Sequence, residues 1–403
     1  MNQLYKHQQN ILSKNPRKAM LVWETGTGKT RTACEWANLN KQVPLIVCPK
    51  ALKTNWQRAL KMWNVQNYAL YSKEEFSKQW QNIPSYNCVI IDEAHYFSGM
   101  KSAMSKNMIK FLKKSKTEFI LMLTATPYLS TPMNIYTLGR LLGKEDEYIW
   151  SYPYFMHHYF NEINMGGRRV PVIKKDAKEK IVKHIDLISD VVKLADCADA
   201  PDSVFDTEYF SLNPDQEKAI KALTDINFIT KWTKTHQICG GTLKGDEYNI
   251  DQYFSSQKKD RLLELIEQNK KLICVFRYNC EIQALQTEIK NKRVYIINGD
   301  VKDKQEVLDK ANTDDDCVLL VNAACSEGWE APTFPLMVFY SLDFSLKNLV
   351  QMFGRIQRIN ALQKCTYLFL VVDDKIDREV YKNVFINKRD FHLEIYDEKM
   401  RTS

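Results

Sequence analysis

The feature that most constrains the fold of this 403-residue chain is a repeated alternation of short apolar runs with longer polar stretches. Runs that are apolar at every position are typical of central strands in a parallel sheet, which are buried on both faces. Strands of this kind separated by helical stretches form right-handed βαβ units. The runs are Ala19–Trp23, Pro44–Cys48, Cys88–Ile91, Phe119–Leu123, Lys271–Phe276, Arg293–Ile297, Cys317–Val321, Leu336–Tyr340 and Tyr367–Val372.

The runs fall into two groups, which predicts an α/β fold with two lobes. The segment between them, about residues 127–253, lacks the rhythm and looks helical and irregular. We expect lobe 1 at residues 1–203, including a helical extension over about 128–203, and lobe 2 at residues 204–403. The length fits this division, since domains of roughly 100–200 residues are common.

Composition narrows the class of protein only slightly. Lysine plus arginine number 57 and aspartate plus glutamate 49, so the net charge is +8, a mild basic excess compatible with a nucleic-acid partner. The first 15 residues show no secretory signal, and no apolar run approaches the roughly 20 residues that span a bilayer. We therefore expect a cytoplasmic protein without a membrane partner. The ten cysteines show no paired zinc spacing and are expected to be buried thiols.

A phosphate-binding loop follows the first strand and opens a helix. Its residues are Thr25, Gly26, Thr27, Gly28, Lys29 and Thr30. Glycines let the backbone N–H groups turn toward phosphate oxygens, and the helix N-terminus favours an anion. Lys29 is expected to reach the β and γ phosphates of ATP, and the Thr30 hydroxyl to ligate Mg²⁺. Trp23 stands where the strict pattern has its first glycine.

An acidic pair follows the strand that ends at Ile91. Carboxylates at the carboxyl end of a buried parallel strand lie on the edge where ligands bind. We expect Asp92 to hold Mg²⁺ and Glu93 to orient or deprotonate the attacking water.

With these motifs in place, their order along nearly the whole chain resembles that of superfamily 2 helicases, and more closely the Snf2-like branch. Leu45–Trp56 is similar to motif Ia, Asp92–His95 to motif II, and Leu123–Pro127 to motif III. Ser326–Glu330 occupies motif V, and Gln351–Asn360 is similar to motif VI. The resemblance implies two tandem RecA-like P-loop lobes.

The resemblance also implies roles for single residues. Gln8 is placed to read the adenine edge, and Gly328 and Glu330 to contact the nucleotide. The coupling between nucleotide and nucleic acid falls to His95, Thr124, Thr126 and Gln351, and the nucleic-acid contacts to Lys50, Lys53, Asn55 and Ser326.

Motif VI places Arg355 and Arg358 three residues apart on one face of an expected helix. The spacing allows both to reach across to the nucleotide from the opposite lobe. Arginines delivered in this way neutralise charge that develops on the γ-phosphoryl group.

The leading hypothesis is an ATPase that uses ATP and Mg²⁺ to translocate on DNA, with duplex DNA favoured. The alternatives are a strand-separating helicase on DNA or RNA, a motor subunit of a nuclease complex, and a binding scaffold without catalysis. The complete set of catalytic residues argues against the scaffold. A wedge or hairpin would distinguish helicase from translocase, and the sequence shows neither. We expect a monomer from a prokaryote or a phage-infected cell.

Overall fold

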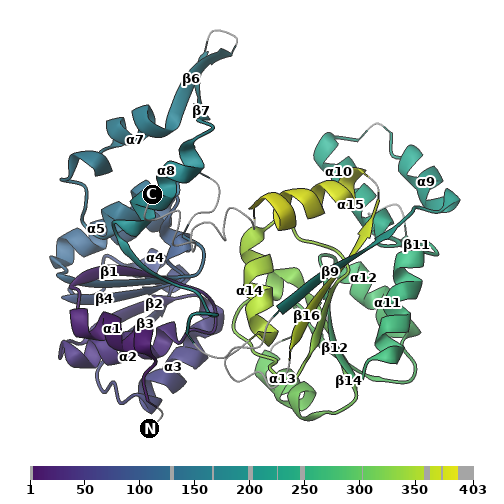
Figure 1. Cartoon of the computed structure of the whole chain (residues 1–403), viewed down its shortest axis with the longest axis horizontal. Coiled ribbons are helices and arrows are strands. Elements are labelled where there is room, and N and C mark those ends of the chain that lie inside the picture. The colour runs from purple at the N-terminus through teal and green to yellow at the C-terminus, as the bar shows by residue number, and fades with distance from the viewer. Residues whose placement is uncertain are drawn as a thin grey trace. The chain divides into compact units, whose positions relative to one another are not determined.

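The computed structural model describes residues 3–127, 131–165, 168–197, 203–224, 226–245, 250–301, 303–357, 364–373 and 375–388. The chain divides into two compact units, residues 1–199 and 200–390. Each unit is built on a six-stranded sheet flanked by helices, the architecture of a RecA-like lobe (Figure 1).

Unit 1 contains a parallel sheet with the strand order β3-β2-β4-β5-β1-β8. Its strands are β1 (Lys18–Trp23), β2 (Pro44–Cys48), β3 (Ala69–Ser72), β4 (Cys88–Asp92), β5 (Phe119–Thr124) and β8 (Ser189–Val192). The helices are α1 (Lys6–Lys14), α2 (Lys29–Leu39), α3 (Lys53–Met62), α4 (Lys73–Gln79), α5 (Ala103–Ser115), α6 (Met133–Leu141), α7 (Tyr152–Tyr159) and α8 (Ala177–Asp186), with 3₁₀ turns η1 (Lys50–Leu52), η2 (Ala94–Phe97) and η3 (Tyr148–Trp150).

Unit 2 repeats this plan with the strand order β13-β14-β12-β15-β16-β9, again all parallel. Its strands are β9 (Ser203–Phe210), β12 (Lys271–Phe276), β13 (Arg293–Ile297), β14 (Cys317–Asn322), β15 (Leu336–Phe339) and β16 (Cys365–Val372). The remaining elements are α9 (Pro214–Lys221), α10 (Phe228–Cys239), β10 (Thr242–Leu243), β11 (Gln252–Tyr253), α11 (Gln257–Gln268), α12 (Asn279–Glu288), α13 (Lys304–Thr313), η4 (Ala323–Cys325), α14 (Leu346–Ile356), α15 (Lys375–Val380) and the π-helical segment η5 (Tyr381–Lys388).

The apolar runs form sheets because their alternate residues enter two separate cores. In β1, Met20 and Val22 pack into one core of unit 1, whereas Leu21 and Trp23 pack into the other. Both faces of these strands are buried, as the sequence predicts for central strands of a parallel sheet. All nine predicted strands are present.

The region between the predicted lobes is less purely helical than expected. Besides α6, α7 and α8, it contains an antiparallel hairpin of β6 (Phe160–Met165) and β7 (Arg168–Ile173). The edge strands β8 and β9 also lie there, each in a different sheet. The sequence does not show this hairpin, because the polar residues of β6 hide its alternating pattern.

None of the helices in the described part of the chain combines the length and apolar character needed to cross a membrane.

Candidate nucleotide site and its coupled segments

The phosphate loop connects the end of β1 to the start of α2, as the sequence predicts. Gly26 and Gly28 both adopt a left-handed φ of 85°, which side chains disfavour. The Lys29 ammonium donates hydrogen bonds to the carbonyl oxygens of Trp23 at 2.8 Å and Glu24 at 3.0 Å. The Thr27 hydroxyl donates to the same Glu24 carbonyl at 2.8 Å. These bonds hold the lysine inside the curl of the loop.

Helix α1 supports this loop from its N-terminal end. Gln8 is fully buried, and its Nε2 donates to the carbonyl of Gly28 at 3.2 Å while its Oε1 accepts from the backbone N–H of Tyr5. A Cβ atom at Gly28 would collide with this amide, so the position requires glycine. His7 Nε2 lies 2.9 Å from the Thr27 carbonyl. The structure thus places Gln8 against the phosphate loop; its contact with adenine stays a prediction.

Trp23, which departs from the usual loop pattern, is a core residue. Its side chain is completely buried, and the indole N–H donates to Asp190 Oδ2 at 2.8 Å. Asp190 lies on β8, which pairs with β1. An edge strand missed by the sequence analysis therefore fixes the residue that precedes the loop.

The acidic pair lies on the same edge of the sheet. Asp92 ends β4, Thr124 ends β5 and the phosphate loop leaves β1, and these three parallel strands are neighbours in the order β4-β5-β1. Because neighbouring strands are about 4.8 Å apart, Asp92 and the start of the loop are separated by about 10 Å. Glu93 has a left-handed φ of 50° although it is not glycine. Such strain in a non-glycine residue is common at functional sites.

Asp92 is buried, and its immediate surroundings explain why its pKa is raised. Burial and the neighbouring Glu93 carboxylate raise the pKa of Asp92 to about 7. The indole N–H of Trp56 donates to Asp92 Oδ2 at 2.8 Å and favours the charged form, as does Lys29. Two carboxylates that share a buried space favour a bound cation.

Trp56 is the residue that sequence reasoning missed. In the sequence, Trp56 is simply the last residue of motif Ia. In the structure it is buried in α3, and its indole connects that helix to Asp92. The signal was its indole N–H, since a buried tryptophan usually finds a hydrogen-bond acceptor.

The side chains expected to couple the site to nucleic acid are brought together. His95 Nδ1 lies 3.1 Å from Glu93 Oε2 and 3.3 Å from the hydroxyl oxygens of both Thr124 and Thr126. The backbone N–H of Thr126 donates to the Thr124 hydroxyl at 3.0 Å. The three coupling residues of motifs II and III are all buried. His95 therefore joins Glu93 to motif III through direct contacts.

The oxygen donors expected to hold Mg²⁺ fit that ion. Thr30 supplies a hydroxyl and Asp92 a carboxylate, and Mg²⁺ commonly takes one or two protein oxygens with phosphates and waters completing its shell. Throughout the described segments, no group of three or more His, Cys, Asp or Glu side chains is arranged to hold a metal. A hydroxyl and a single carboxylate suit an Mg²⁺ ion whose remaining ligands are phosphates and waters.

The candidate nucleic-acid contacts of unit 1 follow β2. Lys50 is exposed in η1, and Asn55 is half-buried in α3. Lys53 forms an ion pair with Glu75 at 2.8 Å, and this carboxylate also accepts from the backbone N–H of Ser72, the N-cap of α4. Lys53 is thus oriented by a helix cap, whereas Lys50 extends into solvent.

In unit 2, motif V follows η4 and packs against α14. Ser326 is buried, and its hydroxyl donates to Gln351 Oε1 at 2.9 Å. Gly328 has a φ of 84°, and Glu330 is exposed. Trp329, which departs from the family's small residues, is a buried core residue whose indole N–H donates to the Cys325 carbonyl. Ser326 thus bonds to motif VI, and its nucleic-acid contact stays a prediction.

Arg355 is held in a fixed position near the end of α14. Its Nε donates to the Gln351 carbonyl at 2.9 Å and its Nη1 to the Trp329 carbonyl at 2.6 Å. The arginine is buried, so motif V orients its guanidinium. The second predicted arginine, Arg358, lies outside the described residues.

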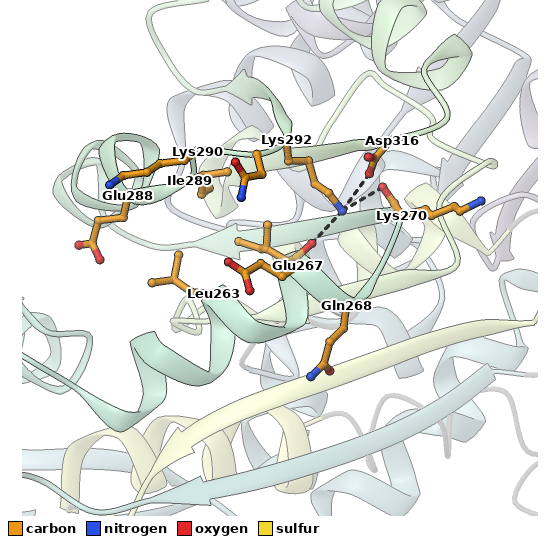
Figure 2. Close-up of a pocket in the computed structure, with 11 residues that line it drawn as sticks. Leu263, Glu267, Gln268, Lys270, Glu288, Ile289, Lys290, Lys292 and Asp316 are labelled. Atoms are coloured by element: carbon orange, nitrogen blue, oxygen red, sulfur yellow. Dashed lines mark hydrogen bonds and ion pairs between the residues drawn. The ribbon is translucent and has the colours of Figure 1, made fainter.

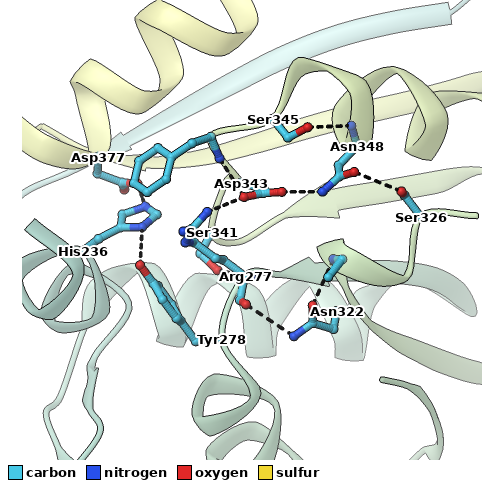
Figure 3. A network of polar contacts seen from close by, with 12 residues as sticks. His236, Arg277, Tyr278, Asn322, Ser326, Ser341, Asp343, Ser345, Asn348 and Asp377 are labelled. Atoms are coloured by element: carbon cyan, nitrogen blue, oxygen red, sulfur yellow. Dashed lines mark hydrogen bonds and ion pairs between the residues drawn. The ribbon is translucent and has the colours of Figure 1, made fainter. Parts of the chain in front are cut away.

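Figure 3 shows a polar network that extends from Ser326 to the end of β12. Ser326 lies 3.4 Å from Asn348 Oδ1, and the amide of Asn348 donates to Asp343. Asp343 also accepts from Arg277, which follows β12. Through Gln351, the network joins this strand end to the helix of Arg355.

Two cavities in unit 2 differ in their position relative to this edge. One of about 530 Å³ is lined by Arg277, Asn279 and Asn322, at the carboxyl ends of β12 and β14. The other, of about 470 Å³, lies at the opposite edge, before β13 and β14, where Lys292 bonds to the Ile266 carbonyl and pairs with Asp316 (Figure 2). Ligands of open α/β sheets bind at carboxyl ends, so the second cavity is not a candidate active site.

Comparison with known proteins gives matches in both units. Residues 65–129 match the family described as type III restriction enzyme, res subunit, and residues 257–360 match the helicase conserved C-terminal domain. The chain is 28% identical over 180 residues to the "SWI/SNF-related matrix-associated actin-dependent regulator of chromatin subfamily A-like protein 1" of Bos taurus, covering 38% of this chain and 18% of that protein. The protein of the same name from Xenopus tropicalis is 28% identical over 150 residues, covering 32% and 16%.

The chain therefore spans less than a fifth of the length of these relatives. Among solved structures, a similarity with a TM-score of 0.44 and 16% identity was found to the "Sulfolobus solfataricus SWI2/SNF2 ATPase core in complex with dsDNA", covering 99% of this chain and 94% of that one. The two family models and the relatives, together with the phosphate loop and motif II, support a helicase of superfamily 2 that is similar to the Snf2-like branch.

Proposed function

We propose that the chain is an ATP-driven motor that hydrolyses ATP and uses the energy to move on duplex DNA. Lys29 and the N–H groups of the phosphate loop bind the phosphates, and Thr30 and Asp92 hold Mg²⁺, which would neutralise phosphate charge. Glu93 accepts a proton from the attacking water or orients it. Arg355 and Arg358 supply positive charge to the γ-phosphoryl group.

The observation that carries this proposal is the hydrogen bond between Trp56 and Asp92. Asp92 is the candidate Mg²⁺ ligand, and Trp56 is the residue that directly follows Asn55, a candidate nucleic-acid contact. The Trp56 indole thus links the candidate Mg²⁺ ligand to the helix turn that carries the candidate nucleic-acid contact. His95 connects Glu93 to motif III in the same way. Both contacts join a candidate ATP-site residue to a segment expected to respond to nucleic acid, and this supports the proposal.

A strand-separating helicase is the second candidate, because the β6–β7 hairpin is a protruding element of the kind that divides two strands (Figure 1). Both candidates require an ATPase that responds to nucleic acid.

The deciding experiment is the steady-state ATPase rate without nucleic acid and then with duplex DNA, single-stranded DNA or RNA at one salt concentration. Strong stimulation by duplex DNA supports the translocase. Preferential stimulation by a single strand or RNA supports the helicase. A rate that none of the three nucleic acids changes would contradict the proposal.

A further inference from the structure

The β6–β7 hairpin is an exposed element of unit 1. It belongs to neither six-stranded sheet, and Figure 1 shows it extending away from the sheet of its own unit. Its strands pair in an antiparallel register from Phe160–Ile173 to Met165–Arg168. The described side chains of residues 161–164 and 169–173 are all exposed. An isolated two-stranded hairpin is only marginally stable in water, so this one depends on the packing at its base.

One face of the hairpin is apolar. The register sets Ile163 opposite Val170, and Val172 opposite Asn161, so these four side chains share a face. Ile163, Val170 and Val172 are 43%, 36% and 42% exposed. β-Branched residues stabilise the strands, but a grouped exposed set of them marks an interaction surface.

The base of the hairpin is fixed in the core of unit 1. Tyr159, the last residue of α7, is completely buried, and its hydroxyl lies 2.6 Å from His184 Nδ1 on α8. The backbone N–H of Lys174 donates to the Tyr159 carbonyl at 2.9 Å and closes the base of the hairpin. Trp150 and Phe155 pack around the same histidine. The hairpin is thus rigidly attached to the lobe that carries the phosphate loop.

The charge of this segment identifies the partner. In sequence, residues 160–183 contain seven lysines or arginines and only three acidic residues, in a chain whose net charge is +8. The Arg169 side chain is 82% exposed and Lys175 is exposed as well. Exposed basic side chains beside an apolar ribbon favour a polyanionic partner, and duplex DNA is the polyanion that the proposed function supplies.

We propose that the β6–β7 hairpin binds duplex DNA, with the face of Ile163, Val170 and Val172 directed toward the bases. Arg169, whose long side chain lies on the other face of the ribbon beside Glu162, and Lys175 at the base of the hairpin would reach the phosphates that border the groove. A two-stranded β-ribbon fits the major groove, where apolar side chains contact the methyl groups of thymine. The proposal rests on the proposed function, because the hairpin would give the motor a second surface that binds duplex DNA.

The test compares duplex-DNA affinity by fluorescence anisotropy across a salt series. Replacing Ile163, Val170 and Val172 together by threonine, which keeps the β-branched shape that strands favour, should weaken binding about tenfold because apolar contact area is lost. Arg169→Glu should weaken binding about threefold or more and reduce the slope of log affinity against log salt by about one.

A matched control is Lys221→Glu in α9. The Lys221 side chain is 79% exposed and pairs with Glu217 at 3.5 Å, much as Arg169 is 82% exposed and pairs with Glu162 at 3.4 Å. The control should bind DNA like the wild type, and all variants should keep the wild-type unfolding temperature, because the changed residues are exposed.

The outcomes separate the two proposals. If duplex DNA binds and stimulates the wild type but the hairpin variants bind it equally well, the hairpin proposal is wrong and the motor proposal stands. If the control loses as much affinity as Arg169→Glu, the effect is general electrostatics and the hairpin proposal is again wrong. If no nucleic acid binds or stimulates the wild type, the proposed function fails first.

Discussion

Each unit buries a carboxylate at the carboxyl edge of its sheet, and the two are built for different purposes. In unit 1, burial and Glu93 raise the pKa of Asp92 to about 7, and the phosphate loop lies two strands away. In unit 2, burial raises the pKa of Glu281 to about 8. Glu281 Oε2 accepts from the Ser341 hydroxyl and from the backbone N–H of Tyr278, which caps α12.

The comparison teaches that a raised pKa reports burial and not function. Glu281 is enclosed by its own helix cap and by Gly240, where any side chain would collide with it. Asp92 has a second carboxylate beside it and a hydroxyl donor in the loop, which together suit a cation. The residues around each carboxylate, and not its raised pKa, therefore distinguish a candidate metal ligand such as Asp92 from a helix-capping residue such as Glu281.

The substitution with the largest expected effect is Lys29→Ala, which tests whether the ATP site lies in unit 1. Loss of the ammonium that meets the phosphates should reduce ATP turnover by about a thousandfold, measured as the steady-state ATPase rate. The control is Lys292→Ala, whose ammonium also bonds to a main-chain carbonyl but lies at the amino edge of unit 2. That variant should keep its turnover per folded molecule. Normal hydrolysis by Lys29→Ala would show that the phosphate loop is wrongly assigned.

The second test exchanges the same groups in both units. Glu93→Gln should slow hydrolysis about a hundredfold while ATP still binds, because the amide cannot take a proton. Single-turnover hydrolysis and binding of a fluorescent ATP analogue measure the two steps. Glu281→Gln should change turnover less than about twofold. Equal loss in both variants would mean that the two buried carboxylates are not functionally different.

The third test sharpens the role of Trp56. Trp56→Phe removes the indole N–H from Asp92 but keeps an aromatic ring, and should raise the Mg²⁺ concentration for half-maximal ATPase activity about tenfold. Trp36→Phe is the control, because Trp36 is equally buried in unit 1 but donates to the Pro16 carbonyl. Each variant loses one buried hydrogen bond, worth about 1 kcal/mol. An unchanged Mg²⁺ dependence in Trp56→Phe would remove the indole from the site.

The last test concerns stability and leaves ATP turnover unaffected. The pKa of Glu281 is raised in the folded state, so its contribution to stability is complete below the ordinary value of 4.5 and is lost as the pH rises through about 8. The unfolding free energy of the wild type should therefore fall by up to about 1.4 kcal/mol per pH unit between pH 5 and 8. Urea unfolding at several pH values should show a shallower fall for Glu281→Gln. Parallel profiles would mean that Glu281 is ionised in the folded protein.

The sequence by itself determined the elements whose physical signal is local. Central strands such as β1 and β14 are apolar at nearly every position because both faces are buried, and this pattern needs no knowledge of neighbours. The sequence also predicts the phosphate loop and the acidic pair, since their chemistry requires particular residues at fixed spacing.

Only the tertiary structure decided the edges and the long-range contacts. The strands that sequence analysis missed in the two large sheets, β3, β8 and β9, all lie at sheet edges, where partial exposure admits polar residues and hides the pattern. The bonds of Trp56 to Asp92 and of Trp23 to Asp190 join residues 36 and 167 positions apart. A hydrogen bond of this kind depends on which elements the fold brings next to each other. The spacing of residues along the chain does not predict that arrangement.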